Sequence, residues 1–197
     1  MENIPENRNE QREIILDSAC TVFAKFGIHK ATMSDIAKGA GLRKTSLYYY
    51  FKSKEEIFRA VMHRENQVIL GAMQTATAKE HSVLGKLTAF FLSRFNYLKE
   101  KRSLYAVHRE NIDEMSHLIV RARQEFVEIE EDFLAGILEE GIAAGEIDIE
   151  NPRLFATVAI AALQGIDTAF WRRGLEEQIE TGMQLIMNIF YKGVRKE

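Results

Sequence analysis

Apolar residues recur at intervals of three and four along most of the chain, which is the period of a helix with one buried face. Between residues 8 and 26 they form a stripe that ends at Gly27, a residue suited to a helix C-terminus. This stripe consists of Ile15, Leu16, Ala19, Phe23 and Phe26. Two short helices are predicted next, from Thr32 to Gly39 and from Arg43 to Tyr50, with a glycine turn between them and Leu47 directed to the core.

Polar capping residues mark where helices begin. Thr32 and Asp35 are three residues apart, as are Ser53 and Glu56, and each pair has the spacing of a capping box. The second pair opens a long helix that runs to about residue 78. Further helices are predicted at 82–100, 103–113, 116–144, 152–173 and 175–193, with Gly145 and Asn151-Pro152 at a break between two of them. No strand alternation persists, so the pattern predicts an all-α fold.

Composition narrows the class of protein. The chain has 197 residues, 46% of them hydrophobic, with only 2 prolines and 12 glycines, which favours long helices and a sizeable core. The single cysteine, Cys20, lies in an apolar run and is interpreted as a buried thiol in a reducing compartment. No secretory signal and no apolar run of about 18 residues is present, so we expect a cytoplasmic protein with no membrane partner.

The net charge of −3 conceals a segregation of charge along the chain. Residues 21–54 carry seven basic side chains and one acidic one, a local charge of +6. Residues 1–20 carry −3 and residues 55–197 carry −6. Clustered basic residues beside two short helices are typical of a DNA-reading head, although a solvated basic surface is the simpler alternative.

The stretch from Thr32 to Glu56 resembles the helix-turn-helix of TetR-family transcriptional regulators. It has the family's threonine opening, the Ile-Ala pair, the Ala-Gly turn, the Leu-Tyr-x-Tyr-Phe end of the recognition helix and the Ser-Lys-Glu start of the fourth helix. The resemblance covers residues 8–60 closely and the remainder more weakly. It implies a three-helix DNA-binding head in residues 1–53 and a larger helical domain for effector binding and dimerisation in residues 54–197.

The recognition helix holds most of the candidate DNA contacts. Its first turn contains Arg43, Lys44, Thr45 and Ser46, the part of such a helix that meets base edges. The family often has serine and glycine where Arg43 and Thr45 stand, so the operator sequence does not follow from a relative. The resemblance assigns Tyr48 and Tyr49 to phosphates and thymine methyls, whereas Tyr50 and Phe51 fit core positions better.

Two helix starts supply further candidate phosphate contacts. Thr32 and Lys54 stand at the beginnings of the second and fourth helices, where free amides and a side-chain donor can hold a backbone phosphate. Capping alone is the alternative for Thr32.

The resemblance also implies a homodimer, formed through the helices at 152–173 and 175–193, and a small-molecule effector. Apolar residues of these helices suit either an interface or the monomer core: Phe155, Val158, Ala159, Ala162, Leu163, Ile166, Leu175, Ile179, Leu185, Ile186, Ile189 and Phe190. Candidate ligand-binding residues combine aromatic groups with two polar ones: Phe91, Phe95, Tyr105, Phe126, Phe133, Trp171, Gln164 and Asp167. The ten acidic residues of 125–150 are interpreted as a solvated face.

Other function classes find less support. The sequence has no phosphate-binding glycine loop and no Cys-x-x-Cys or His-Glu-x-x-His motif, so no enzyme, catalytic residue, metal or cofactor is expected. A helical adaptor or a lipid carrier stays open as the alternative, but neither needs a basic, tyrosine-bearing head. The favoured hypothesis is a dimeric repressor that binds a palindromic operator in double-stranded DNA and is released by an effector.

Overall fold

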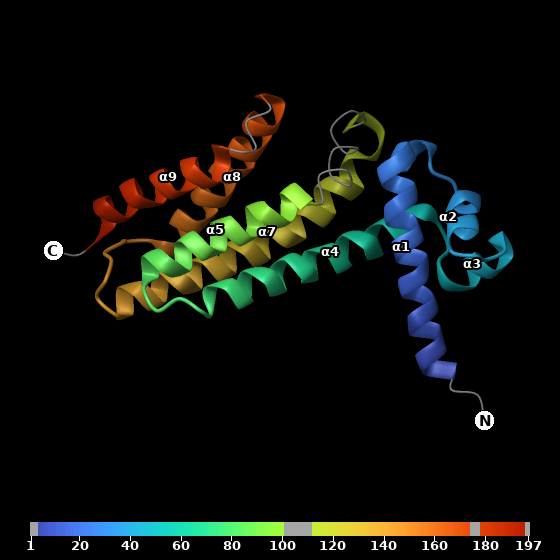
Figure 1. The fold of residues 1–197 in the computed structure, drawn as a ribbon, viewed down its shortest axis with the longest axis horizontal. Helices are drawn as coiled ribbons and strands as arrows, with labels where there is room; N and C mark the ends of the chain where they lie inside the picture. Colours follow the sequence, from blue (N-terminus) through green and yellow to red (C-terminus); the bar gives the residue numbers. More distant parts are fainter. Residues whose placement is uncertain (1–3, 101–111, 174–177, 196–197) are drawn as a thin grey trace. The chain divides into compact units, whose positions relative to one another are not determined.

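The computed structural model is helical, in agreement with the predicted all-α fold (Figure 1). It describes the backbone of residues 4–100, 112–173 and 178–195, and the side chains of residues 8–97, 124–165, 178 and 181–195. Within these ranges the only strand-like pairing is an isolated antiparallel bridge between Ile147 and Arg195. The helices are α1 (Ile4–Lys30), α2 (Met33–Gly39), α3 (Lys44–Tyr50), α4 (Lys54–Thr77), α5 (Val83–Glu100), α7 (Ile112–Ala143), α8 (Pro152–Arg173) and α9 (Ile179–Val194).

Helix α1 is longer than its hydrophobic stripe predicts. It begins at Ile4 rather than at residue 8, and Gly27, with φ 76° and ψ 160°, interrupts it where an end was predicted. The chain resumes a helical turn as far as Lys30. Phe26 departs from the predicted inward face, because 44% of its surface is exposed and its ring lies beneath the ammonium of Lys25.

Local hydrogen bonds define α2 and the turn that follows it. The Thr32 hydroxyl accepts from the Asp35 amide and the Asp35 carboxylate accepts from the Thr32 amide, so the predicted capping box is present. Gly41 has a φ of 68°, a conformation that favours glycine, and it lets the Leu42 amide donate back to the carbonyl of Ala37. The chain thereby turns directly into α3.

Helix α4 begins as predicted, with a different pattern of capping. The Ser53 hydroxyl accepts from the Glu56 amide, but the Glu56 carboxylate accepts from the amide of Lys52, one residue before the expected partner. The extended conformation of Phe51 ends α3 and precedes this turn. Val68 of α4 is half exposed.

Two compact units divide the chain, and α4 and α7 contribute to each of them. The first unit contains residues 4–66 and 112–123 of the described chain. Its core is formed by α1, α2, α3 and the first turns of α4, with Phe23, Leu47, Phe51 and Phe58 among the fully buried side chains. The rings of Phe23 and Phe58 meet edge to face with centroids 5.8 Å apart.

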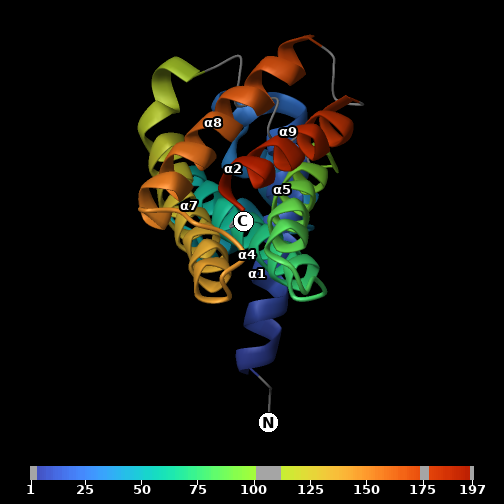
Figure 2. The same ribbon diagram turned by 90° about the vertical axis from the view of Figure 1, so that its left-hand side faces the viewer.

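The second unit contains residues 67–100 and 124–195 of the described chain. Its core gathers Ile69 and Met73 of α4 with the inner faces of α5, α7, α8 and α9. Figure 2 shows α9 lying over α5 and α8 lying over α7. An ion pair between Arg153 of α8 and Asp132 of α7 joins the second of these pairs at the surface.

The predicted helix end near residue 113 is wrong. Helix α7 runs without a break from Ile112 to Ala143, because no glycine or proline occurs between Ile112 and Ala135. The part of the predicted 103–113 helix before residue 112 lies outside the described residues. Gly145, with φ 72°, ends α7 as predicted, and Asn151 accepts from the Leu154 amide to cap α8.

Candidate nucleic-acid interface

Helix α3 has one buried side and one exposed side. Leu47 and Phe51 are almost completely buried and anchor the helix to the core. The exposed side chains are Arg43, Lys44, Thr45, Tyr48 and Tyr49, with Ser46 half buried. Five of the residues predicted to contact DNA therefore share the solvent-facing side of one short helix. Tyr50 packs against the core and Phe51 lies within it, as predicted.

The two tyrosines expose aromatic surface that the core does not use. Tyr48 is 46% exposed and Tyr49 is 70% exposed. The ring of Tyr49 meets that of Tyr50 edge to face, with centroids 5.4 Å apart. An exposed phenol can donate to a phosphate or contact a thymine methyl group.

The side chain of Arg43 does not cap α3. Arg43 occupies the N-cap position of α3, yet it makes no side-chain capping hydrogen bond. Its guanidinium and the ammonium of Lys44 stand at the start of the helix, and both side chains are exposed. A guanidinium or ammonium at this place can pair with guanine N7 and O6.

Thr32 is fully engaged as a cap. Its hydroxyl donates to Asp35 Oδ2 at 2.6 Å while accepting from the Asp35 amide, and its own amide donates to the same carboxylate oxygen. These hydrogen bonds from Thr32 hold the pKa of Asp35 below its ordinary value. Because a hydroxyl has one proton, Thr32 can donate to a phosphate only when its bond to Asp35 opens.

The ammonium of Lys54, predicted to contact a phosphate, has partners within the first unit. It donates to the carbonyls of Ile28, His29 and Ala31, at 2.9, 2.8 and 3.1 Å. An ammonium has three protons, so these carbonyls occupy all of its donors. The side chain ties the start of α4 to the last turn of α1 and to Ala31, which follows it. A phosphate contact by the Lys54 ammonium would require one of these bonds to be exchanged.

Two arginines of α1 lie against the end of α3, and sequence reasoning missed them. The Arg8 guanidinium lies 5.3 Å from the centroid of the Tyr49 ring. The Arg12 guanidinium lies 4.3 Å from the centroid of the Phe51 ring and donates to the carbonyl of Tyr50 at 3.1 Å. Their spacing of four residues places them on one face of the helix that was predicted from residue 8 onward, and this was a usable signal in the sequence.

A cluster around Arg64 joins α4 to α1 inside the first unit. Arg64 pairs with Glu13 at 3.0 Å and with Asp17 at 2.8 Å, and its Nη2 lies 3.4 Å from Cys20 Sγ. Burial would lower the pKa of Arg64, but its hydrogen bonds to these carboxylates outweigh burial and raise it. Cys20 is half buried rather than fully buried as predicted, because it borders this polar cluster.

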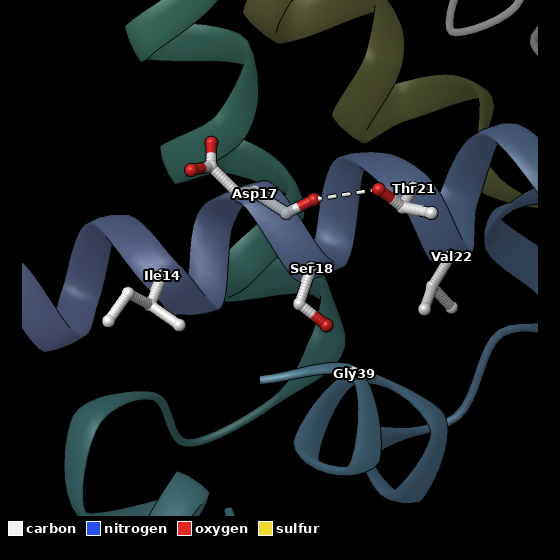
Figure 3. A pocket seen from close by; sticks show the side chains of 6 residues that line it. All are labelled: Ile14, Asp17, Ser18, Thr21, Val22 and Gly39. Carbon is white, nitrogen blue, oxygen red and sulfur yellow. Dashed lines mark hydrogen bonds between the residues drawn. The ribbon is translucent and has the colours of Figure 1, made fainter. Parts of the chain in front are cut away.

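A shallow hollow lies between α1 and α2 (Figure 3). Its volume is about 350 Å³, and it is lined by Ile14, Asp17, Ser18, Thr21, Val22 and Gly39. The polar groups on its wall already have partners: Thr21 donates to the Asp17 carbonyl, and Ser18 donates to the Ile36 carbonyl. The hollow therefore offers little recognition chemistry.

The predicted ligand-binding residues differ in burial. Phe91 and Phe95 are buried, whereas Phe126, Phe133 and Gln164 are partly buried. Phe91 and Phe133 both lie against Phe90, in edge-to-face contacts at 5.1 and 5.6 Å. Tyr105 and the side chains of Asp167 and Trp171 lie outside the described residues. The same unit contains a buried ion pair, in which Arg94 Nε donates to Glu130 at 2.6 Å.

Helices α8 and α9 expose large apolar side chains on the second unit. Of the residues predicted to form a dimer interface or a core, Phe155, Ala159, Leu163 and Phe190 pack against the core of that unit. Outward-facing ones include Val158, Leu185, Ile186 and Ile189, joined by Leu154. Ala162 is also exposed, while the side chains of Ile166, Leu175 and Ile179 lie outside the described residues.

Neither a metal site nor a membrane-spanning helix occurs among the described residues. No group of histidine, cysteine and acidic side chains there is arranged to hold a metal ion. No described helix combines the length and apolar character needed to cross a membrane.

Comparisons with known proteins agree with the architecture of the head. The family model described as "Bacterial regulatory proteins, tetR family" matches residues 15–61. The HTH-type transcriptional repressor KstR2 of Mycolicibacterium smegmatis is 30% identical over 145 residues, covering 72% of this chain and 69% of that protein. The fatty acid metabolism regulator protein of Bacillus subtilis is 30% identical over 136 residues, covering 68% and 69%.

Solved structures extend the likeness over nearly the whole chain. A transcriptional regulator from Cytophaga hutchinsonii has a TM-score of 0.78 at 24% identity, covering 93% of this chain and 98% of that one. FadR from Bacillus subtilis, solved with stearoyl-CoA, has a TM-score of 0.74 at 24% identity, covering 89% and 96%. At these identities the structures establish a shared fold.

The relatives settle the class of protein. Both curated relatives are named as regulators, one of them explicitly as a transcriptional repressor, and such proteins are not enzymes. This agrees with the expectation of a non-enzymatic protein and favours a regulator over a helical adaptor or a lipid carrier. With its helix-turn-helix, its matching family model and a repressor that is 30% identical over two thirds of its length, the chain belongs to the TetR family of bacterial transcriptional regulators.

Proposed function

We propose that the protein is a ligand-responsive repressor that binds a palindromic operator as a homodimer and is released by a small-molecule effector. The observation that carries the proposal is the exposed side of α3, where Arg43, Lys44, Thr45, Tyr48 and Tyr49 face solvent while Leu47 anchors the helix. The surrounding segment has a charge of +6, as DNA binding requires. The proposed repressor acts in the cytoplasm.

Each candidate residue has a role in this proposal. Arg43, Lys44, Thr45 and Ser46 read base edges in the major groove, and Tyr48 and Tyr49 contact the backbone and thymine methyl groups. Thr32 and Lys54 support this surface chiefly by capping α2 and by holding α4 to the end of α1. Residues 1–53 contact DNA, and residues 54–197 bind the effector and form the dimer.

The outward faces of α8 and α9 support the homodimer. A second copy of the chain would cover Leu154, Val158, Leu185, Ile186 and Ile189, which otherwise expose large apolar side chains to water. Small exposed residues beside them, Ala161 and Ala162, allow helices of two copies to approach closely. The resulting four-helix bundle would place one recognition helix in each half of a palindrome.

The effector is proposed to bind among the aromatic residues of the second unit. The predicted lining residues are Phe91, Phe95, Tyr105, Phe126, Phe133, Gln164, Asp167 and Trp171. The Bacillus subtilis relative is named for fatty acid metabolism, and FadR of the same species was solved with stearoyl-CoA, so a fatty acyl-CoA is the first effector class to test. An apolar acyl chain suits a site built from phenylalanines.

Selection of duplexes from a random DNA pool tests the proposed function. We expect the wild-type protein to enrich a palindromic sequence and to bind it with an affinity that falls steeply as salt rises. Lys44→Ala should relax discrimination at one position of each half-site, by about 1–3 kcal/mol if Lys44 reads a base. Absence of any enriched sequence, with no salt-sensitive binding, would contradict the proposal.

Effector release is tested on the selected duplex. A long-chain acyl-CoA should lower the affinity for this duplex, whereas free coenzyme A should have no effect. Release by neither compound would reject the acyl-CoA class, while leaving the DNA-binding part of the proposal to the selection experiment.

A further inference from the structure

The first turns of α1 lie beside the end of the recognition helix, outside the helix-turn-helix itself. Arg8 and Arg12 are one helical turn apart, and both guanidinium groups meet aromatic rings from the end of α3. Arg12 is half buried, and its hydrogen bond to the Tyr50 carbonyl anchors α1 to this end. Arg8 is exposed, and its contact is with the ring of Tyr49, which is itself 70% exposed.

Charge on α1 is divided between two faces of the helix. Glu13 and Asp17, also one turn apart, pair with Arg64 of α4. Arg8 and Arg12 occupy the face toward α3 instead. The segment 1–20 has a net charge of −3, yet the two basic residues it contains both lie against the recognition helix. Although residues 1–20 are acidic overall, the face of α1 toward α3 is therefore positively charged.

Stability alone gives little reason for the position of Arg8. A cation over an aromatic ring at an exposed site contributes weakly to folding. Among the residues that the structure describes, no hydrogen bond or ion pair of the Arg8 guanidinium accompanies this contact. Within the described part of the chain its N–H donors therefore have no acceptor, and an acceptor from outside the chain can approach them. A stacked guanidinium keeps its in-plane donors, which match the oxygens of a phosphate.

We propose that Arg8 and Tyr49 together form a binding element for a backbone phosphate of the operator, which extends the DNA interface from α3 to the first turns of α1. The ring of Tyr49 holds the guanidinium, and the phenol and guanidinium donate to oxygens of the DNA backbone. The occupant is DNA because the element continues the proposed interface on α3 and carries the complementary charge. This inference rests on the proposed function of the head.

The salt dependence of binding tests the proposal, measured on the duplex that the wild-type protein selects from a random pool. Arg8→Ala should weaken binding about tenfold for each protomer, which is the effect of a lost charged hydrogen bond. The slope of log affinity against log salt should become shallower by about 0.9 for each protomer, because one phosphate contact is lost. Arg8→Lys should keep the slope and lose part of the affinity.

Two further variants separate a phosphate contact from a structural role. Arg59→Ala removes the same charge from an exposed arginine on α4, and it should leave the slope unchanged. In a Tyr49→Ala background, Arg8→Ala should weaken binding less than it does in the wild type, because the two residues act as a unit. A folded Arg8→Ala protein with the wild-type salt slope would overturn the inference. Failure of the wild-type protein to bind DNA would instead overturn the proposed function.

Discussion

The ammonium of Lys54 has as many carbonyl partners as it has protons, and this single side chain holds three backbone groups around the α1–α2 connection. Lys54→Met keeps an unbranched side chain as far as the ε position but removes the ammonium and its donors. We expect the free energy of unfolding to fall by about 2 kcal/mol, because hydrogen bonds from a charged donor are lost and the carbonyls lose their partner. Urea denaturation measures this change.

An exposed lysine two residues away gives the control. Lys52→Met removes the same charge from a side chain in solvent, and it should change the free energy of unfolding by less than about 0.5 kcal/mol. Equal effects of the two substitutions would show that Lys54 is not a structural clamp. If Lys54 acts only through the fold, its replacement should also leave the salt slope of DNA binding unchanged.

The carboxylate of Asp35 predicts a pH dependence of stability. Its pKa lies below the ordinary value of 3.8 in the folded protein, because the hydroxyl and amide of Thr32 donate to the charged form. Because this pKa is lower in the folded than in the unfolded protein, the charged carboxylate stabilises the fold at pH values above the unfolded pKa. The contribution is lost as the pH falls through the folded pKa. Asp35→Asn should therefore be less stable than the wild type at neutral pH.

The difference in the free energy of unfolding between wild type and Asp35→Asn isolates this group from other carboxylates. It should be constant from neutral pH down to about 4 and should shrink below that, as the wild-type carboxylate becomes protonated. A difference that does not depend on pH would assign the effect to the geometry of the cap instead of its charge.

At the scale of the helices, α1 and α2 approach closely at Ser18 and Gly39 (Figure 3). A Cβ added at Gly39 would lie 2.3 Å from Ser18 Oγ, which donates to the Ile36 carbonyl at 2.8 Å. Glycine-to-alanine changes in helices normally stabilise by about 0.5–1 kcal/mol. We expect Gly39→Ala to destabilise by about 1–2 kcal/mol instead, measured by thermal or urea unfolding, because Ser18 must move and break its hydrogen bond.

Two backgrounds test this explanation. In Ser18→Ala the hydroxyl is absent, and Gly39→Ala should then be neutral or stabilising, since the Cβ of residue 18 lies 3.4 Å from the added carbon. Gly71→Ala on α4 should stabilise the protein in the usual way, because among the described residues no side chain and no other helix lies within 4 Å of the added carbon. If Gly39→Ala instead raises the free energy of unfolding of the wild-type protein, the contact with Ser18 does not restrict the side chain at position 39.

Features that depend on residues close together in the sequence were predicted correctly. The Thr32 cap, the turn at Gly41 and the end of α7 at Gly145 were predicted because each depends on residues within one turn of the chain. The outward placement of Tyr48 and Tyr49 followed from the burial of Leu47 on the same helix. These features cover most of the head and its exposed recognition surface.

Interactions between distant segments could not be predicted in the same way. The partners of Lys54 lie more than twenty residues before it, and carbonyl groups leave no mark in a sequence. The contact of Arg8 with Tyr49 depends on how α1 crosses α3, and the sequence segment around Arg8 is acidic overall. The predicted break near residue 113 was wrong for a different reason. The apolar pattern changes there, but no residue that would end a helix is present at that place.

At the scale of the whole molecule, charge and apolar surface are segregated between the parts that the proposal assigns to DNA and to dimerisation. The segment 21–54 carries +6 and residues 55–197 carry −6. The large exposed hydrophobic side chains of α8 and α9 are aliphatic, and they lack the charge that would suit contact with DNA. Electrostatic attraction to DNA therefore favours approach by the head, while the exposed apolar face suits a second protein copy.

The face on α8 and α9 predicts how the oligomeric state depends on single residues. In a twofold interface each substitution occurs twice, so Ile189→Glu would bring two carboxylates into an apolar contact. Ile189 is 64% exposed, and the fold of one chain should therefore tolerate the change. We expect a monomer by sedimentation, with unchanged helicity and with operator affinity reduced by about 100-fold, because the two heads no longer bind as one linked unit.

Gln74→Glu supplies the matched control, since it adds the same charge to an exposed position on α4. It should leave both sedimentation and operator affinity unchanged. Leu185→Glu, on the same face of α9 as Ile189, should repeat the effect of Ile189→Glu, since both side chains would lie under the second copy. A dimer that survives both substitutions would place the interface elsewhere, and the exposed aliphatic face of α8 and α9 would then need a different partner.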